Sequence, residues 1–114
     1  MTAKDSSLLV VKFGGSSLAS AERIKLAAGS VAAKVSSGTK VVVVVSAMGK
    51  TTDELLLLAK EVTGSSKGFE LDDILSMGER TSARIFAAAL NARGVKAEYI
   101  DPADPSWPII TDGN

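Results

Sequence analysis

The stretch LLVVKFGGSS, Leu8–Ser17, is an apolar segment that contains one lysine and is followed by a glycine pair and two serines. The apolar residues predict a buried strand over about residues 8–13, and the glycine pair predicts a tight turn at its end. A helix is expected next, because Ser20 offers a hydroxyl cap and apolar residues recur at helical spacing up to Val35. This order of elements is typical of a βαβ unit on a parallel sheet.

The same alternation continues along the rest of the chain. Five consecutive valines predict a second strand over residues 40–46, and their unbroken apolar character favours burial on both faces of the sheet. Two further helices are predicted over residues 52–62 and 72–92, joined by a flexible linker over 63–69, and a short strand is predicted over 96–100. We therefore expect a layered α/β fold with a parallel sheet.

Composition limits the chemistry that the chain can perform. The 114 residues are 46% hydrophobic, which is enough for one core, and the 13 basic residues balance the 13 acidic ones. This balance argues against nucleic acid or an anionic membrane surface as a partner. The sequence has no cysteine or histidine, so thiolate and imidazole chemistry are excluded. It also lacks a signal-like N-terminal segment and a run long enough to span a bilayer, so we expect a cytoplasmic location.

Lys12 stands near the end of the first predicted strand, directly before the glycine pair. Ligands of open α/β sheets collect at this end of the strands, and glycines allow backbone N–H groups to approach an anion closely. A lysine beside them adds a full positive charge, which suits a phosphate. The alternative is an ordinary tight turn with a lysine that reaches solvent.

The segment GKT, Gly49–Thr51, looks like the tail of a phosphate-binding P-loop. That motif needs a glycine where Val44 stands, so its phosphate cradle is not expected here. Thr51 and Glu54 have the spacing of a capping box, and we interpret Thr51 as the helix cap. Thr52 is then left for another partner.

Glu79 is the third candidate. It is predicted at the apolar edge of its helix, facing partly inward, with no basic residue three or four positions away. It is either a boundary residue that reaches solvent or a carboxylate that receives a cationic group of a ligand.

Three segments together resemble the aspartate kinases of the amino acid kinase family. VVKFGGSS resembles the start of these enzymes, with Ser16 where the family usually has threonine. VVVVSAMGKTTDELL resembles their second strand and following helix, and ILSMGERTSARIFAAAL is similar to their substrate-binding helix. The resemblance keeps the same order from Leu8 to Asn114.

The resemblance implies an αβα sandwich with a mainly parallel sheet and ATP-dependent phosphorylation of the L-aspartate side-chain carboxylate to 4-phospho-L-aspartate, which begins the lysine, threonine and methionine pathway. Lys12 would be catalytic. The ATP phosphates would be held by Lys12, Phe13, Gly14, Gly15, Ser16 and Ser46. Thr52 and Glu79 would hold L-aspartate, with Glu79 receiving its ammonium group. Mg²⁺ would accompany ATP without an assigned protein ligand, and a homo-oligomer is expected for the full-length protein.

Aspartate kinases continue well past the point that corresponds to Asn114. Residues 1–114 are therefore expected to be the N-terminal portion of one amino acid kinase domain, without the nucleotide-binding half and the ACT regulatory domains, and to be inactive alone. Two alternatives stay open. One is a P-loop-like nucleotide hydrolase, disfavoured by Val44, and the other is a non-catalytic module that binds a small ligand or a partner.

Overall fold

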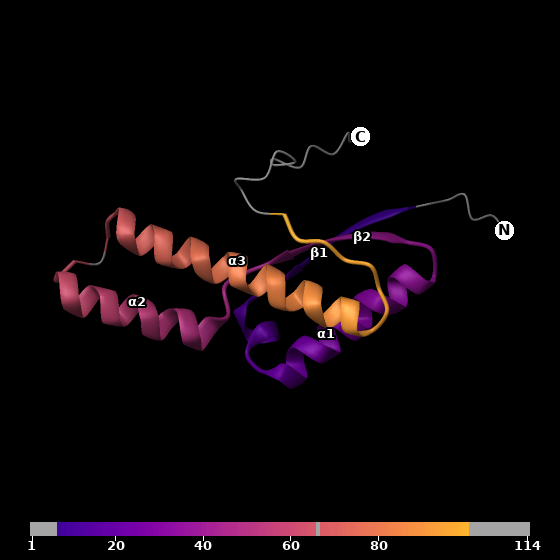
Figure 1. Ribbon diagram of the computed structural model, residues 1–114, viewed down its shortest axis with the longest axis horizontal. Helices are drawn as coiled ribbons and strands as arrows, with labels where there is room; N and C mark the ends of the chain where they lie inside the picture. The colour runs from indigo at the N-terminus through magenta and orange to yellow at the C-terminus, as the bar shows by residue number, and fades with distance from the viewer. Residues whose placement is uncertain (1–6, 66, 101–114) are drawn as a thin grey trace.

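The computed structural model describes residues 7–65 and 67–100 of the chain. The elements are, in order, β1 (Leu8–Phe13), the 3-10 helix η1 (Gly15–Leu18), α1 (Ala21–Ser36), β2 (Lys40–Val45), α2 (Gly49–Thr63) and α3 (Phe69–Ala92). The two strands pair in parallel, with Leu8 opposite Lys40 and Phe13 opposite Val45, and α1 crosses between them (Figure 1). This arrangement confirms the expected α/β class with a parallel sheet.

Local sequence signals set several of the element boundaries. Ser20 caps α1 as predicted, because its Oγ accepts a hydrogen bond from the backbone N–H of Arg23 at 3.2 Å. Gly64 ends α2 in the left-handed conformation, with a φ of 71° that disfavours residues with a Cβ atom. The linker between α2 and α3 therefore lies where it was predicted.

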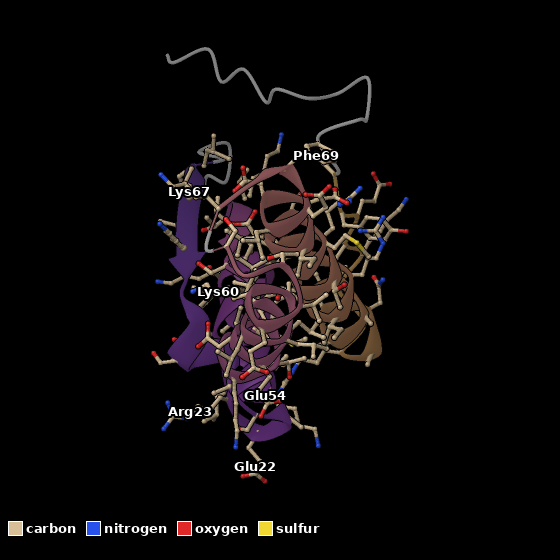
Figure 2. All side chains as sticks on the ribbon, turned by 90° about the vertical axis from the view of Figure 1, so that its left-hand side faces the viewer. Glu22, Arg23, Glu54, Lys60, Lys67 and Phe69 are labelled. Atoms are coloured by element: carbon tan, nitrogen blue, oxygen red, sulfur yellow. The ribbon has the colours of Figure 1, made fainter. Side chains whose placement is uncertain are left out.

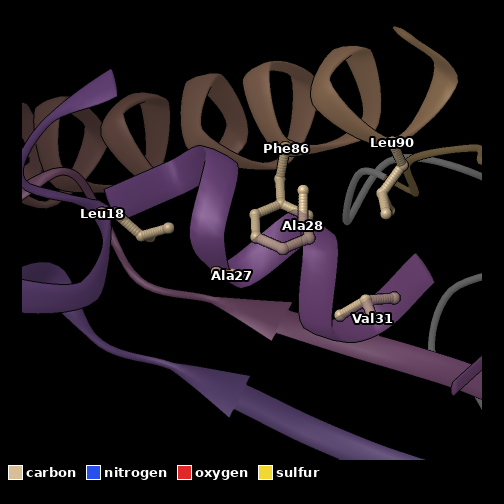
Figure 3. Close-up of a cluster of buried hydrophobic side chains, with 6 residues drawn as sticks. All are labelled: Leu18, Ala27, Ala28, Val31, Phe86 and Leu90. Atoms are coloured by element: carbon tan, nitrogen blue, oxygen red, sulfur yellow. The ribbon is translucent and has the colours of Figure 1, made fainter. Parts of the chain in front are cut away.

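The core lies between one face of the sheet and the helices α1 and α3. Its buried members are Leu18, Ala27, Ala28, Val31, Phe86 and Leu90. In Figure 3, Phe86 and Leu90 extend from α3 toward Ala28 and Val31 of α1. The ring of Phe86 also stacks on Phe13, the last residue of β1, with 5.3 Å between the ring centroids. This contact fixes α3 against the end of the strand.

The opposite face of the sheet is exposed in the described part of the chain. Leu8 and Val10 on β1 and Val44 on β2 point to this side, and Val44 is 45% exposed. The prediction that the valines of β2 are buried on both faces of the sheet is therefore wrong for Val44. The reason is that both helices that contact β2, α1 and α3, contribute to the same core.

The predicted strand over residues 96–100 is also not formed. This segment is held to α3 by Asn91, whose Oδ1 accepts a hydrogen bond from the N–H of Ala97 at 2.9 Å. The Nδ2 of Asn91 donates to the carbonyl of Ala97 at 3.4 Å. The side-chain amide thus occupies backbone groups of Ala97 that a strand neighbour would use, and a groove of about 700 Å³ separates the segment from β2.

Helices α2 and α3 lie side by side as a hairpin that projects beyond the sheet (Figure 1). Figure 2 looks onto this end of the molecule and shows Glu54 and Lys60 of α2, with Phe69 at the start of α3. None of the described helices is both long enough and apolar enough to cross a membrane.

Candidate active site

The first loop of the candidate site follows β1 and contains the glycine pair. Gly14 caps η1, and its carbonyl accepts a hydrogen bond from the N–H of Ser17 at 3.1 Å. A Cβ atom on Gly15 would lie 3.4 Å from both the Cα and the N of Gly49. Gly15 therefore brings the backbone of this loop close to the start of α2, whereas a Cβ atom on Gly14 would meet open space.

The second loop follows β2 and leads into α2. Ser46 continues the pairing of the strands, because its N–H donates to the carbonyl of Phe13 at 3.1 Å. The cap of α2 is Met48, which provides no side-chain hydrogen bond. The N–H groups of the first turn of α2 thus lack a capping side chain and carry the partial positive charge of the helix. Such a helix end favours an anion such as a phosphate or a carboxylate.

The prediction that Thr51 caps α2 is wrong. Thr51 lies inside the first turn and is exposed, because the helix begins at Gly49, where its backbone meets Gly15. The capping-box spacing is a local signal, and this contact between distant loops overrides it. The structure also places Val44 inside β2, so the glycine of a P-loop has no counterpart at that position.

Thr52 is buried, at 5% exposure, and it meets α3 at Gly78. A Cβ atom on Gly78 would lie 2.6 Å from Thr52 Oγ1 and 3.1 Å from Ala47 Cβ. A glycine inside a helix costs about 1 kcal/mol relative to alanine, so its presence here marks a required close approach. The sequence prediction missed this residue, although a glycine within a helical pattern was a usable signal.

Glu79 follows Gly78 and is exposed, so the prediction that it faces partly inward is wrong. Phe86 stands seven residues later and about 20° away around the helix axis, yet it is only 3% exposed. The difference arises because Phe86 packs on the last residue of β1, whereas Glu79 lies two turns nearer the N-terminus of α3. There it follows Gly78, which meets Ala47 beyond the end of β2. Its carboxylate is therefore accessible to a ligand at that end of the sheet.

Lys12 is exposed on the other side of the sheet. Side chains alternate along β1, and since Phe13 points toward Phe86, Lys12 points away from α3. The structure thus brings the glycine loop, the start of α2 and Thr52 together. Lys12 lies on the face of β1 away from α3 and Glu79 lies on α3, and no ion pair joins the two among the described residues.

The two remaining candidates, Phe13 and Ser16, differ in their exposure. Phe13 is partly buried against the core and its carbonyl is bonded to Ser46, so it supports the loop from behind. Ser16 is exposed in η1, and its carbonyl accepts a hydrogen bond from Arg23 Nη1 at 3.0 Å. Among residues 7–65 and 67–100, no three or more carboxylate side chains gather where they could hold a metal ion.

Comparison with known proteins gives a consistent result. Residues 7–109 match the amino acid kinase family. The chain is 49% identical over 90 residues to an aspartokinase of Geobacillus stearothermophilus, covering 79% of this chain and 22% of that protein. It is 48% identical over 106 residues to an aspartokinase of Mycobacterium bovis, covering 93% of this chain and 25% of the relative.

A solved structure agrees with these sequence matches. The crystal structure of aspartate kinase from Synechocystis superimposes with a TM-score of 0.71 at 41% identity, covering 76% of this chain and 15% of that one. The chain thus spans about a quarter of the length of the curated relatives it matches. The resemblance drawn from the three sequence segments is confirmed.

Proposed function

Because the chain belongs to the amino acid kinase family, we propose that it supplies the aspartate-binding part, and a share of the phosphate-binding part, of an ATP-dependent aspartate kinase. One observation carries the proposal: the glycine loop after β1, the uncapped start of α2 and the Thr52–Gly78 contact converge at the C-terminal ends of two parallel strands. Ligands of open α/β folds bind at this place. In this proposal residues 1–114 form a portion of one amino acid kinase domain.

The reaction requires charge neutralisation more than proton transfer. The side-chain carboxylate of aspartate has an ordinary pKa of about 3.9 and is already ionised at neutral pH, so the lack of histidine is no obstacle. One carboxylate oxygen forms a bond to the γ-phosphorus of ATP while the bond from that phosphorus to ADP breaks. Two anions must therefore be held in line against their mutual repulsion.

The residues of this chain divide that task. The N–H groups of the glycine loop and of the first turn of α2 would face the phosphates, and Lys12 would add a positive charge from the other side of the sheet. The Thr52 hydroxyl would donate to the substrate carboxylate, and the exposed Glu79 would accept from the substrate ammonium. Mg²⁺ would come with the phosphates of ATP.

Ligand titration tests the proposal on the chain itself. An isotope-labelled sample titrated with L-aspartate is expected to show backbone amide shifts around Thr52 and Glu79. Succinate, which lacks the ammonium group, should bind more weakly. Glu79→Gln should weaken L-aspartate about ten- to hundredfold, because a charge-assisted hydrogen bond contributes roughly 1.5–3 kcal/mol. It should leave Mg-ATP binding unchanged, whereas Lys12→Ala should weaken Mg-ATP and leave L-aspartate nearly unchanged.

A chimaera tests the activity. The matching segment of the Geobacillus stearothermophilus aspartokinase can be replaced by the 90 aligned residues of this chain. We expect aspartate-dependent ADP release, with KM for aspartate raised by Glu79→Gln. A folded chimaera without activity, or equal loss of both ligands in Glu79→Gln, would contradict the proposal.

A further inference from the structure

Ser82 is a buried hydroxyl that the function described so far does not use. It lies on α3 at 2% exposure, and its Oγ has no hydrogen-bond partner among the described residues. Burying a hydroxyl without a partner lowers stability, and the neighbouring positions 83 and 87–89 are all alanine, so a smaller apolar residue would suit the helix. Packing alone therefore does not explain why a serine occupies this position.

The position of Ser82 on α3 points to the candidate site. Gly78, Ser82 and Phe86 are spaced by four residues and share one face of the helix. Gly78 meets Thr52 and Ala47, and Phe86 stacks on Phe13, so Ser82 lies between these two contacts. Both contacts belong to the ends of strands and the loops that follow them.

Thr52 supplies the matching group. Side chains on a helix lean toward its N-terminus, so the Ser82 hydroxyl can reach the turn that contains Gly78. Thr52 Oγ1 lies at that turn, 2.6 Å from where a Cβ atom of Gly78 would stand. Within the described part of the chain, Thr52 Oγ1 makes no hydrogen bond, and Thr52 is 5% exposed. The buried Ser82 hydroxyl and the Thr52–Gly78 contact thus lie on the same face of α3, about one helical turn apart along the helix.

We propose that Ser82 is a positioning residue for Thr52. A rotation about the Cα–Cβ bond of Ser82 lets its O–H donate to Thr52 Oγ1. A hydroxyl has one proton to donate and two lone pairs to accept with, so Thr52 then directs its own proton at the substrate carboxylate. The proposal rests on the proposed function and assigns the Thr52 hydroxyl its orientation.

A double-mutant cycle on L-aspartate binding tests this role in the whole 114-residue chain. The affinity is measured by the same amide-shift titration for the parent, Ser82→Ala, Thr52→Ala and the double variant. We expect Ser82→Ala to weaken L-aspartate about three- to tenfold, the range of one neutral hydrogen bond. It should have no further effect when Thr52 is already alanine. Thr81→Ala, which removes an exposed hydroxyl from the neighbouring position, is the matched control and should change nothing.

Two further measurements separate positioning from structure. Measured without L-aspartate, the melting temperature of Ser82→Ala should equal or exceed that of the parent, because Ser82 Oγ makes no hydrogen bond among the described residues before the ligand binds. The Mg-ATP affinity of Ser82→Ala should not change. A lower melting temperature with equal loss of both ligands would mean a structural role and overturn the proposal. So would the same loss of L-aspartate affinity with and without the Thr52 hydroxyl. If the parent does not bind L-aspartate, the proposed function is refuted, and so is the positioning role of Ser82 that rests on it.

Discussion

Replacing Gly78 by alanine tests how tightly α3 is packed against the site. The new Cβ would lie 2.6 Å from Thr52 Oγ1, 3.3 Å from Thr52 Cγ2 and 3.1 Å from Ala47 Cβ. Overpacking of this kind costs roughly 1–3 kcal/mol of the free energy of unfolding. The substitution also gains about 1 kcal/mol of helix propensity, so we expect a net loss of about 1 kcal/mol.

Gly29→Ala on α1 is the matched control. It makes the same substitution inside a helix, but a Cβ there would meet the end of the Arg93 side chain, with Nη2 at 3.2 Å. A flexible guanidinium can move aside, at the expense of its 3.2 Å hydrogen bond to the carbonyl of Lys25. The difference between the two variants removes the propensity gain and leaves the cost of the clash at Gly78, roughly 1–3 kcal/mol, less the contribution of the lost Arg93 hydrogen bond.

Urea unfolding followed by circular dichroism measures this difference, and thermal unfolding should place Gly78→Ala several degrees below Gly29→Ala. In a Thr52→Ala background, Gly78→Ala should lower the free energy of unfolding by less, because only the contact with Ala47 remains. If Gly78→Ala were as stable as Gly29→Ala, the close contact between α2 and α3 would be refuted.

Three other predictions concern the rest of the chain. Ser20→Ala removes the hydrogen bond from the N–H of Arg23 and should lower the free energy of unfolding by about 1 kcal/mol; an unchanged urea midpoint would show that the cap contributes nothing. Asn91→Ala removes both hydrogen bonds to the backbone of Ala97, so the amide hydrogen of Ala97 should exchange with solvent faster while amides of α1 keep their rates. Equal protection of Ala97 in the parent and the variant would show that Asn91 does not hold this segment. The chain alone should release no aspartate-dependent ADP from Mg-ATP, because in the proposed function it supplies only part of the groups that hold the two anions in line. Turnover by the purified chain would overturn this prediction.

Local signals in the sequence were sufficient for several elements. The hydroxyl of Ser20 and the helical spacing after it fixed the start of α1, and the glycine at position 64 ended α2 inside the predicted linker. The glycine pair after β1 correctly placed a tight loop at the strand end. In each case the determining groups lie within a few residues of one another, so pattern and conformation coincide.

Two of the predictions that failed depended on groups distant in sequence, and one depended on a local side chain. The cap at Thr51 was displaced because Gly49 packs on Gly15. The strand over 96–100 did not form because Ala97 is bonded to the side chain of Asn91, six residues earlier. The orientation of Glu79 followed from where the strands end relative to α3. A helical wheel gives the direction of a side chain and says nothing about which element covers it.

The stack of Phe13 on Phe86 has a consequence for how the chain is synthesised. The two rings are joined across most of the sequence, whereas β1, α1 and β2 are complete once Val45 has been made. A nascent chain on the ribosome can therefore form the parallel strand pair early, while the face that α3 will cover remains open to water until Phe86 emerges. During that interval the uncovered apolar face can associate with another chain. Slow translation between Val45 and Phe86 should therefore favour aggregation, and chaperones that shield exposed strands should act in this period.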